Sequence, residues 1–467
     1  MSEPSMPVLV PSQPAMAAPR WLLPAALAPV LAAVLGFGAT YSWVWAPVAV
    51  ALFAAVAIWI WQLATQPSRP WPWHPILIPM LAFAALVGVQ WLFHLSVYPG
   101  QTLTGLVLLA ACGCSFYLGL AFASRARALD SLVRVLWVFL GLLATEAVVQ
   151  YFTAHGFIYW FHDASYATPV GPFVYHNHFG GCLELLLPPA AALALLPGGS
   201  GDRSFSGHVL RALPALAGLA ALMISQSRGA LLAVGFELLL ALLLFWRDWF
   251  SSARGRGLVL ALVGVSAAIM LLANPGAMLA RFEHMANNRV NSFSTRLEIS
   301  ASALQIFRNH PWVGTGLGTF GVEYPRYQTL DDRLVYDYAH DDYAQALAET
   351  GVAGAVCILA FLGTWIWAGF RTWRGEGIHR RRRALQLACF IAMAGLLVHS
   401  FGDFEFHSQA LALLFFLELG AVLAAPSPVS VDAARPRLPN PGHGRARGNR
   451  HAQLRRTHAA RAGTSPL

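Results

Sequence analysis

Lysine is absent from this chain of 467 residues, and charged residues of all kinds make up only 11% of it. All 31 basic residues are therefore arginines. Hydrophobic residues make up 57% of the chain, which leaves too few polar side chains to cover a soluble protein of this length. The composition argues against an ordinary soluble domain and predicts a membrane protein.

Cysteine is also scarce: there are five in the whole chain, and all lie within apolar runs. Cys112 and Cys114 are two positions apart, so on a helix they point in different directions and make a poor pair of metal ligands. The sequence shows neither a disulfide framework nor a zinc-binding spacing. We interpret the cysteines as small buried hydrophobic residues.

Long apolar runs, by contrast, recur along the chain. About twelve of them approach the length of roughly 20 residues with which a helix crosses a bilayer. They lie at 21–39, 43–64, 75–94, 101–123, 129–153, 177–196, 207–225, 229–246, 257–273, 351–373, 384–402 and 407–425. The sequence therefore predicts an all-α polytopic membrane protein with about 12 transmembrane helices.

Arginine is distributed unevenly among the connections between these runs. One set falls in alternate loops, on one side of the predicted membrane: Arg20, Arg69, Arg125, Arg127, Arg203, Arg247, Arg254, Arg256 and the run Arg380 to Arg383. The positive-inside rule makes that side cytoplasmic, and an even number of spans then places both termini there. The net charge of +9 is mostly explained by this topology and is poor support for nucleic-acid binding.

The predicted domain organisation follows from the spans. Residues 1–20 form a cytoplasmic N-terminal tail, 21–273 contain transmembrane helices 1–9, and 351–425 contain helices 10–12. Between them, residues 274–350 form one large helical loop outside the cytoplasm. Residues 426–467 are basic and rich in proline and glycine, which predicts a disordered cytoplasmic tail.

The external loop carries arginines on the side where arginine is normally depleted: Arg281, Arg289, Arg296, Arg308, Arg326 and Arg333. Arg228, in SQSRG between the seventh and eighth spans, is a further outward arginine. Long loops escape the insertion bias, so ordinary solvated charge explains most of these residues. That explanation is weakest for Arg228, which lies in a tight turn where the bilayer meets water.

A helix is predicted to begin within this loop. TRLE, Thr295 to Glu298, fits a capping box with Thr295 at the N-cap, and His310 followed by Pro311 ends the helix. The predicted apolar stripe consists of Leu297, Ala301, Leu304 and Phe307. Arg296 would lie in the first turn, where the helix dipole disfavours a cation and a bound anion would reverse that penalty.

The segment GLGTFG, residues 316–321, matches a dinucleotide-binding pattern, which we reject because no strand-turn-helix context surrounds it. Its glycines are expected to allow a tight backbone path. After His340, DDYAQALAET predicts a short helix that leads into the tenth span, with Gly351 and Gly354 loosening the junction. His340 is either an ordinary polar residue at the external rim or a base, because neutral imidazole can accept a proton from a hydroxyl.

A second polar patch, His176, Asn177 and His178, lies at the external start of the sixth span. It is either an interfacial collar or part of the same cavity as His340. Four acidic residues lie within apolar runs: Glu146, Glu184, Glu237 and Glu418. Acids inside a membrane indicate function or packing against polar groups of the bundle.

Together these motifs resemble the O-antigen ligase and Wzy-type polymerase superfamily. The matching segments are SQSRG at 225–229, TRLEISASALQIFRNHPWVGTGLGTF at 295–320 and AHDDYAQALAETGVAG at 339–354, together with GPFVYHNHFGGCLELLLP at 171–188. The resemblance covers the middle and C-terminal two thirds of the chain. It implies a GT-C-like glycosyltransferase of the bacterial inner membrane whose active site faces the periplasm.

The resemblance also implies the reaction and its residues. A glycan passes from undecaprenyl pyrophosphate to an acceptor hydroxyl, without a metal or other cofactor. Arg228 and Arg296 would hold the pyrophosphate, and His340 would assist the acceptor. Candidates for lining the substrate cavity are Arg289, Asn177, His178, Asp341 and Glu349. The family often has asparagine after this histidine, so whether Asp341 orients His340 is open.

Several functions remain open at this stage. Within the family the acceptor is lipid A-core for a ligase, which we slightly favour, or a growing polysaccharide for a polymerase. A transporter would explain the many spans but not the outward arginines, and a lipid-linked glycan flippase would need no base. A metal-dependent glycosyltransferase would use the external acidic residues Asp331, Asp332, Asp337, Asp341 and Asp342.

Overall fold

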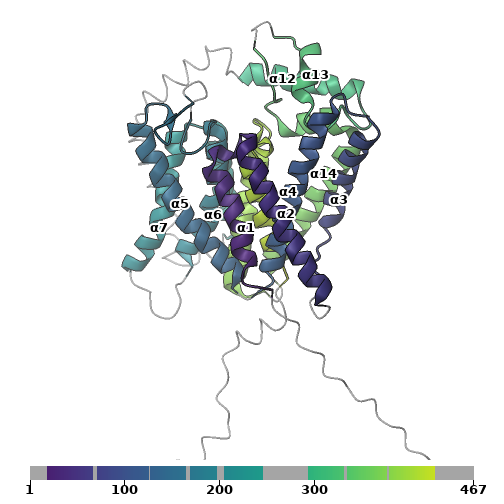
Figure 1. The fold of residues 1–467 in the computed structure, drawn as a ribbon. Coiled ribbons are helices and arrows are strands. Elements are labelled where there is room, and N and C mark those ends of the chain that lie inside the picture. Colours follow the sequence, from purple (N-terminus) through teal and green to yellow (C-terminus); the bar gives the residue numbers. More distant parts are fainter. Residues whose placement is uncertain are drawn as a thin grey trace, which may run out of the picture.

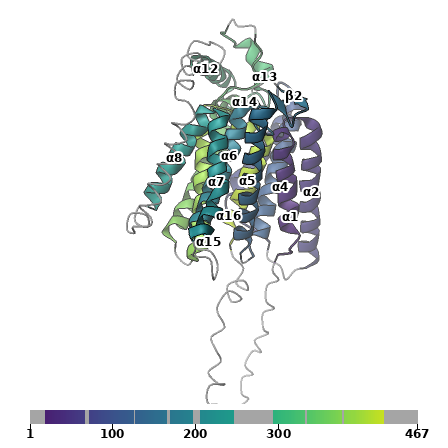
Figure 2. The ribbon, with the colours of Figure 1, turned by 90° about the vertical axis from the view of Figure 1, so that its left-hand side faces the viewer.

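A computed structural model describes residues 18–66, 71–125, 127–164, 169–196, 205–245, 293–330, 334–375 and 378–425. Long helices run side by side, and a smaller helical part containing α12 and α13 lies beyond one end of them (Figures 1 and 2). The α-helices are α1 (Leu22–Leu35), α2 (Ser42–Thr65), α3 (Leu77–Leu92), α4 (Pro99–Phe122), α5 (Ala128–Thr153), α6 (His176–Leu195), α7 (Phe205–Ser225), α8 (Arg228–Leu244), α12 (Phe293–Asn309), α13 (Phe320–Glu323), α14 (Asp342–Arg374), α15 (Arg380–His399) and α16 (Gln409–Leu423).

The remaining regular elements are short. The 3-10 helices are η1 (Phe37–Ala39), η4 (Tyr324–Arg326) and η5 (Glu405–His407). Strands β1 (Phe157–Ile158) and β2 (His162–Asp163) pair antiparallel, with Ile158 opposite His162. Within the described ranges the fold is therefore almost entirely helical, as the sequence predicts.

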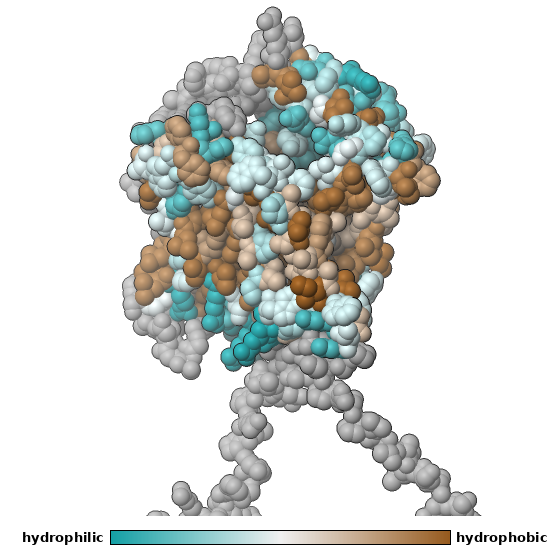
Figure 3. All heavy atoms as spheres, in the orientation of Figure 1, coloured by the Kyte–Doolittle hydropathy of each residue, from teal (hydrophilic) through white to brown (hydrophobic). Residues whose placement is uncertain are grey.

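Six helices are long and apolar enough to cross a membrane by length and composition: α2, α4, α5, α6, α14 and α15. Shorter apolar helices are α1, α3, α16 and the part of α7 from Val209 to Ser225. Eleven of the twelve predicted spans overlap a helix, and the remaining one, 257–273, lies outside the described residues. On the face drawn in Figure 3, apolar residues gather in a band across the middle of the molecule, which is consistent with a multi-pass membrane protein.

Two pairings define the interior of the bundle. Among the six candidate spans, α6 and α15 are the most enclosed. In their most apolar 18-residue stretches, 78% and 72% of the residues are buried, against 17% for α14. Helix α4 crosses α16 closely because a side chain at Gly119 or Gly420 would strike the backbone of the other helix. Ser115 on α4 also donates a hydrogen bond to the Leu413 carbonyl on α16, at 2.8 Å. Small residues therefore set the separation between α4 and α16.

Arginines at one end of the bundle bind the ends of helices. Arg382 donates to the carbonyls of Ala123 and Ala424, which follow α4 and α16. Arg381, beside it on α15, pairs with Asp130 in the first turn of α5. The part of the chain that contains α12 and α13 lies at the opposite end (Figure 1). Among the described residues, the run Arg380 to Arg383, predicted to be cytoplasmic, is thus separated from Arg296, Arg308 and Arg326 of the long loop by the length of the bundle.

Helix α12 differs from its prediction in two ways. It begins at Phe293, so Thr295 lies inside the helix and is not its N-cap, while Arg296 is its fourth residue; the predicted end before His310 is confirmed. The predicted apolar stripe is also wrong, because Leu297, Ala301 and Leu304 are exposed. The face that packs is formed instead by Ile299, Ala303 and Ile306, which contact a cluster of Phe320, Tyr324, Ala339, Ala344 and Ala348.

Helix α14 is two helices joined at Gly351, which has φ 62° and ψ −161°. The amides of Val352 and Ala353 leave the helical pattern and donate to the carbonyls of Pro311 and Trp312, at 2.8 and 3.0 Å. A side chain at Gly351 would overlap that backbone. The expected loosening at Gly351 is therefore a sharp break that binds the segment after α12 to the bundle.

We expect Gly351→Ala to lower the stability of the purified protein by about 1–3 kcal/mol or more, since alanine disfavours this backbone conformation. The measurement is thermal unfolding in detergent. Gly363→Ala is the matched control: this glycine lies in the same helix with open space around it. Equal losses in the two variants would contradict a specific role for the break.

Candidate active site

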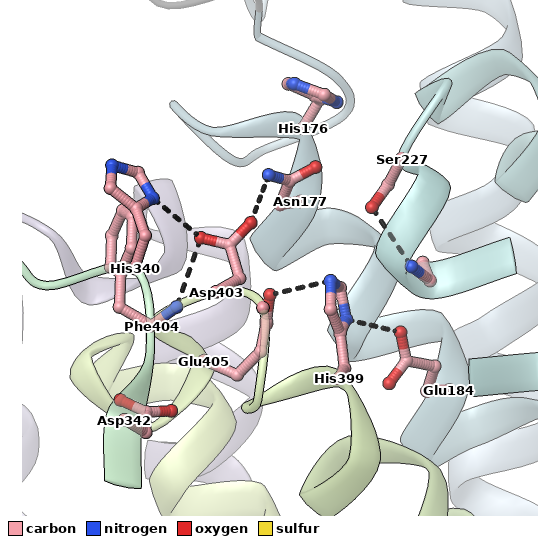
Figure 4. Close-up of polar contacts among 12 residues, drawn as sticks. His176, Asn177, Glu184, Ser227, His340, Asp342, His399, Asp403, Phe404 and Glu405 are labelled. Atoms are coloured by element: carbon pink, nitrogen blue, oxygen red, sulfur yellow. Dashed lines mark hydrogen bonds and ion pairs between the residues drawn. The ribbon is translucent and has the colours of Figure 1, made fainter. Parts of the chain in front are cut away.

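The site is centred on Asp403, in the connection between α15 and η5 (Figure 4). Its carboxylate is 1% exposed and collects four polar contacts. His340 Nδ1 lies 3.3 Å from Oδ1, which also accepts from the Phe404 amide at 3.1 Å. Oδ2 accepts from Asn177 Nδ2 and, at 3.2 Å, from Arg296 Nη1. One carboxylate thus joins side chains from α6, α12 and the segment before α14.

The charges around Asp403 fix its protonation. Burial alone would raise the pKa of this carboxyl, but the hydrogen bond from His340 and the charges of Arg296 and His399 outweigh burial and hold that pKa well below its usual range. Asp403 is therefore an anion that can only accept hydrogen bonds. His340 must then carry its proton on Nδ1, which leaves the lone pair of Nε2 available to a ligand.

Local structure presents His340 at the rim. Its backbone has φ 52°, a left-handed conformation that is uncommon for histidine. The ring lies 4.9 Å from that of Phe404 in an edge-to-face contact, and Tyr338 stacks on Phe404 at 4.6 Å. The side chain is 24% exposed, so the imidazole is fixed by its neighbours yet accessible.

The two aspartates after His340 hold the helix that follows. Asp341 is the N-cap of α14 and accepts from the amides of Tyr343 and Ala344, both at 3.0 Å. Asp342 Oδ1 lies 2.7 Å from His407 Nδ1, and Oδ2 accepts from the Phe406 amide at 3.0 Å. The carboxylate that contacts the His340 ring is thus Asp403, and Asp341 caps a helix.

His407 connects this region to the rest of α14. Burial lowers the pKa of His407, but its hydrogen bond to Asp342 and the charges of Asp342 and Glu349 outweigh burial and raise it. Its Nε2 lies 2.9 Å from Gln345 Nε2, and Gln345 in turn donates to Glu349 at 3.0 Å. The connection after α15 and the start of α14 therefore form one bonded unit.

A second buried cluster lies deeper than Asp403 (Figure 4). His399 Nδ1 lies 2.8 Å from Glu184 of α6, and its Nε2 lies 3.4 Å from Glu405. All three side chains are at most 1% exposed. Burial and the charges of Asp403 and Glu184 raise the pKa of Glu405 well above its usual range, despite the opposing charge of His399.

Ligand atoms of His399, Asp403 and Glu405 lie within 4.8 Å of one another, a spacing that could hold a cation. Asp403 fits this role poorly, because its oxygens already accept four hydrogen bonds and one donor is the Arg296 cation. A metal would have to displace or tolerate that guanidinium. The arrangement favours an ion-pair and hydrogen-bond network.

Arg228 lies at the edge of the deeper cluster. It is the first residue of α8, directly after Ser227, whose hydroxyl caps the helix through the Ala230 amide at 3.2 Å. The next residue, Gly229, touches His399 so closely that a side chain there would overlap the imidazole. The same turn is bound to α6, since His176 Nδ1 lies 3.0 Å from the Ser225 carbonyl.

Comparison with protein families agrees with this geometry. Residues 213–359 match the family model described as O-antigen ligase. This part of the chain, about a third of its length, is similar to the O-antigen ligase family. The matched region contains Arg228, Arg296 and His340, whereas Asn177 and Asp403 lie outside it. A search of curated proteins finds no match to the chain.

The structure brings some of the predicted site residues of this O-antigen ligase-like chain together and places others apart from them. His340, Arg296 and Asn177 meet at Asp403, and Arg228 lies in the adjoining turn. His178 is buried with its ring 4.9 Å from Phe404, so it supports the connection that carries Asp403. Arg289 lies outside the described residues.

Glu349 faces the glycine-rich segment and is buried. Its two carboxylate oxygens accept from the amides of Gly318 and Phe320, at 2.8 and 3.0 Å. Gly314, Gly316 and Gly318 all have positive φ, which confirms the expected tight backbone path. Glu349 thus holds this loop of the O-antigen ligase-like region to α14.

The residue that sequence reasoning missed is Asp403. A usable signal exists in FGDFEFH, residues 401–407, which places two acidic residues and a histidine in a short connection between two apolar runs. That connection lies on the same side as His340 in the predicted topology. Asp403, which is remote in sequence from the family motifs, is the residue that brings them together.

Proposed function

We propose that this protein transfers a glycan from an undecaprenyl-pyrophosphate donor to a sugar hydroxyl on the periplasmic face of the bacterial inner membrane, with lipid A-core as the acceptor in a ligation reaction. The observation that carries this proposal is the shared carboxylate of Asp403. It holds a candidate base, His340, and a candidate phosphate-binding cation, Arg296, at one rim of the bundle. A transporter or flippase has no need of that pairing.

Two arginines stabilise the leaving pyrophosphate in this proposal. Outside the cytoplasm no ATP is at hand, so the energy for transfer resides in the glycosyl-pyrophosphate bond. Among the described residues, the hydrogen bonds of Arg296 to Asp403 and to the Gly402 carbonyl both use Nη1. The Nε and Nη2 side of the guanidinium can therefore donate two parallel hydrogen bonds to phosphate oxygens. Arg228 supplies the second guanidinium from the start of α8.

His340 removes the acceptor proton. Its Nε2 accepts the proton as the hydroxyl oxygen attacks the anomeric carbon, and the bond from that carbon to the pyrophosphate oxygen breaks. Attack opposite the leaving group inverts the anomeric centre. Asp403 is a positioning residue that holds the imidazole and stabilises the imidazolium formed. Charge neutralisation by arginine makes a metal unnecessary in this scheme.

The test of this function is reconstitution. Purified protein in liposomes receives a lipid-linked glycan donor and a lipid A-core acceptor, and the linked product is measured with and without a chelator. Product formation that survives chelation supports a metal-independent transferase. Movement of donor across the bilayer without bond formation would support a flippase, and elongation of the donor glycan alone would identify a polymerase.

We expect Arg296→Lys to retain only part of the transfer activity and Arg296→Ala to retain very little, because lysine keeps the charge but lacks the paired donors. The same order is expected at Arg228. Arg308→Lys, an exposed position on the same helix as Arg296, is the control and should transfer normally. Normal turnover in a well-inserted Arg228→Ala protein would remove that arginine from the mechanism.

A further inference from the structure

A cavity of about 250 Å³ lies at the end of the bundle that the arginine pattern predicts to be cytoplasmic. It forms where α1 and α5 begin and α4 ends. The residues that line it are Pro19, Arg20, Leu23, Phe122, Arg125, Ala128 and Ser131. It is remote from Asp403, which lies at the opposite end of the helices, and the proposed transfer reaction makes no use of it.

The cavity is strongly cationic. Arg20 and Arg125 both line it, and none of the described residues that line it is acidic. Asp130 is in the first turn of α5, but this carboxylate already pairs with Arg134 and Arg381. The positive charges of Arg20 and Arg125, which line one small space, repel each other. An anion bound between them would offset this repulsion.

The helix ends beside the cavity also favour an anion. The N-cap residues of α1 and α5 are Trp21 and Arg127, and neither makes a side-chain capping hydrogen bond. Both helices therefore direct uncapped amides and the positive end of their dipole toward this end of the bundle. A helix start of this kind favours anions, and here two of them meet beside two arginines.

Size and lining narrow the class of ligand. The volume is below the roughly 300–1,000 Å³ of pockets that enclose drug-sized molecules, so the cavity suits a headgroup rather than a nucleotide sugar. Leu23 and Phe122 form an apolar wall beside the arginines. Phosphate next to a short apolar segment matches both parts of this surface.

We propose that this cavity binds a phosphate group through Arg20 and Arg125. Two sources share this chemistry: the headgroup of an anionic phospholipid in the adjoining leaflet, and a free phosphate compound. Arginine suits either source because its fork binds two phosphate oxygens at once. The site would bind its ligand whether or not transfer takes place at the other end of the bundle.

The experiment compares lipid and phosphate binding by the full-length protein in detergent. Phosphatidylglycerol, phosphatidylcholine and inorganic phosphate are titrated separately, and binding is read by native mass spectrometry and by the shift in thermal unfolding. The test variant is Arg20→Gln/Arg125→Gln. Arg134→Gln, an exposed and acid-paired arginine at the same end, is the matched control.

We expect one phosphatidylglycerol to bind in preference to phosphatidylcholine, and the double variant to bind it at least about ten-fold more weakly, as the loss of charge-assisted hydrogen bonds implies. Binding of inorganic phosphate that is lost in the same variant would instead identify a free phosphate compound as the source. If the glutamine variant does not fold, Arg20→Lys/Arg125→Lys should still show several-fold weaker binding. Equal binding by wild type and a folded variant, or no preference for either phosphate ligand, would overturn the proposal.

Discussion

Replacing Asp403 with asparagine is expected to reduce glycan transfer by roughly two to four orders of magnitude, without loss of the folded protein. An amide can donate a hydrogen bond to His340 Nδ1 as well as accept one, so the imidazole is no longer held with its lone pair on Nε2. The imidazolium formed during attack also loses its counter-charge. The measurement is the transfer rate of purified protein with saturating donor and acceptor.

Asp341→Asn is the matched control for this effect. Asparagine caps a helix about as well as aspartate, so the start of α14 should persist and transfer should change by less than about three-fold. Because Asp341 is adjacent to His340 in sequence, the pair of variants separates the two candidate carboxylates. A large loss in Asp341→Asn with little change in Asp403→Asn would reverse the assignment made from the structure.

His340→Gln is expected to have a comparably large effect, since glutamine keeps hydrogen bonding but cannot accept the proton. Transfer should fall by roughly two to four orders of magnitude, the usual contribution of general base catalysis. Binding of the donor should survive, because the arginines that hold pyrophosphate are intact. The decisive comparison measures donor affinity and turnover separately in wild type and variant.

The pH–rate profile gives an independent test of the same base. Wild-type transfer should increase with pH around neutrality, because a general base must be unprotonated to accept the acceptor's proton. Asp403 does not complicate this range: its pKa is held well below the usual value, so the carboxylate stays charged throughout. A rate that does not depend on pH there, or equal rates for wild type and His340→Gln, would leave His340 as a residue of the rim only.

The parts of the structure that the sequence predicted are those fixed by local pattern. Apolar runs as long as a bilayer is thick gave the helices, and Gly351 gave the break in α14 because few other residues adopt its backbone conformation. The glycines of residues 314–318 likewise predicted a tight path. In each case a short stretch of sequence determines the local structure, so the structure can be predicted without knowing the rest of the fold.

The features that the sequence did not predict correctly depend on contacts between distant segments. On α12, Leu297 and Leu304 form an apolar stripe as regular as that of Ile299 and Ile306, and the positions of α13, η4 and α14 decide which one is buried. Asp403 was missed for the same reason, because its partners come from α6, α12 and the segment before α14. The segment FGDFEFH marks this connection as polar, but it does not indicate that Asp403 will be buried among a histidine, an arginine and an asparagine.

The position of Asp403 also determines when the protein acquires its site during synthesis. Arg296 and His340 are translated before the helical hairpin of α15 and α16, whose connection carries the carboxylate that joins them. Until that hairpin enters the membrane, a partly inserted chain lacks the carboxylate that holds His340 and Arg296 in place. Chains that stop before the final hairpin should therefore be inert in the proposed transfer.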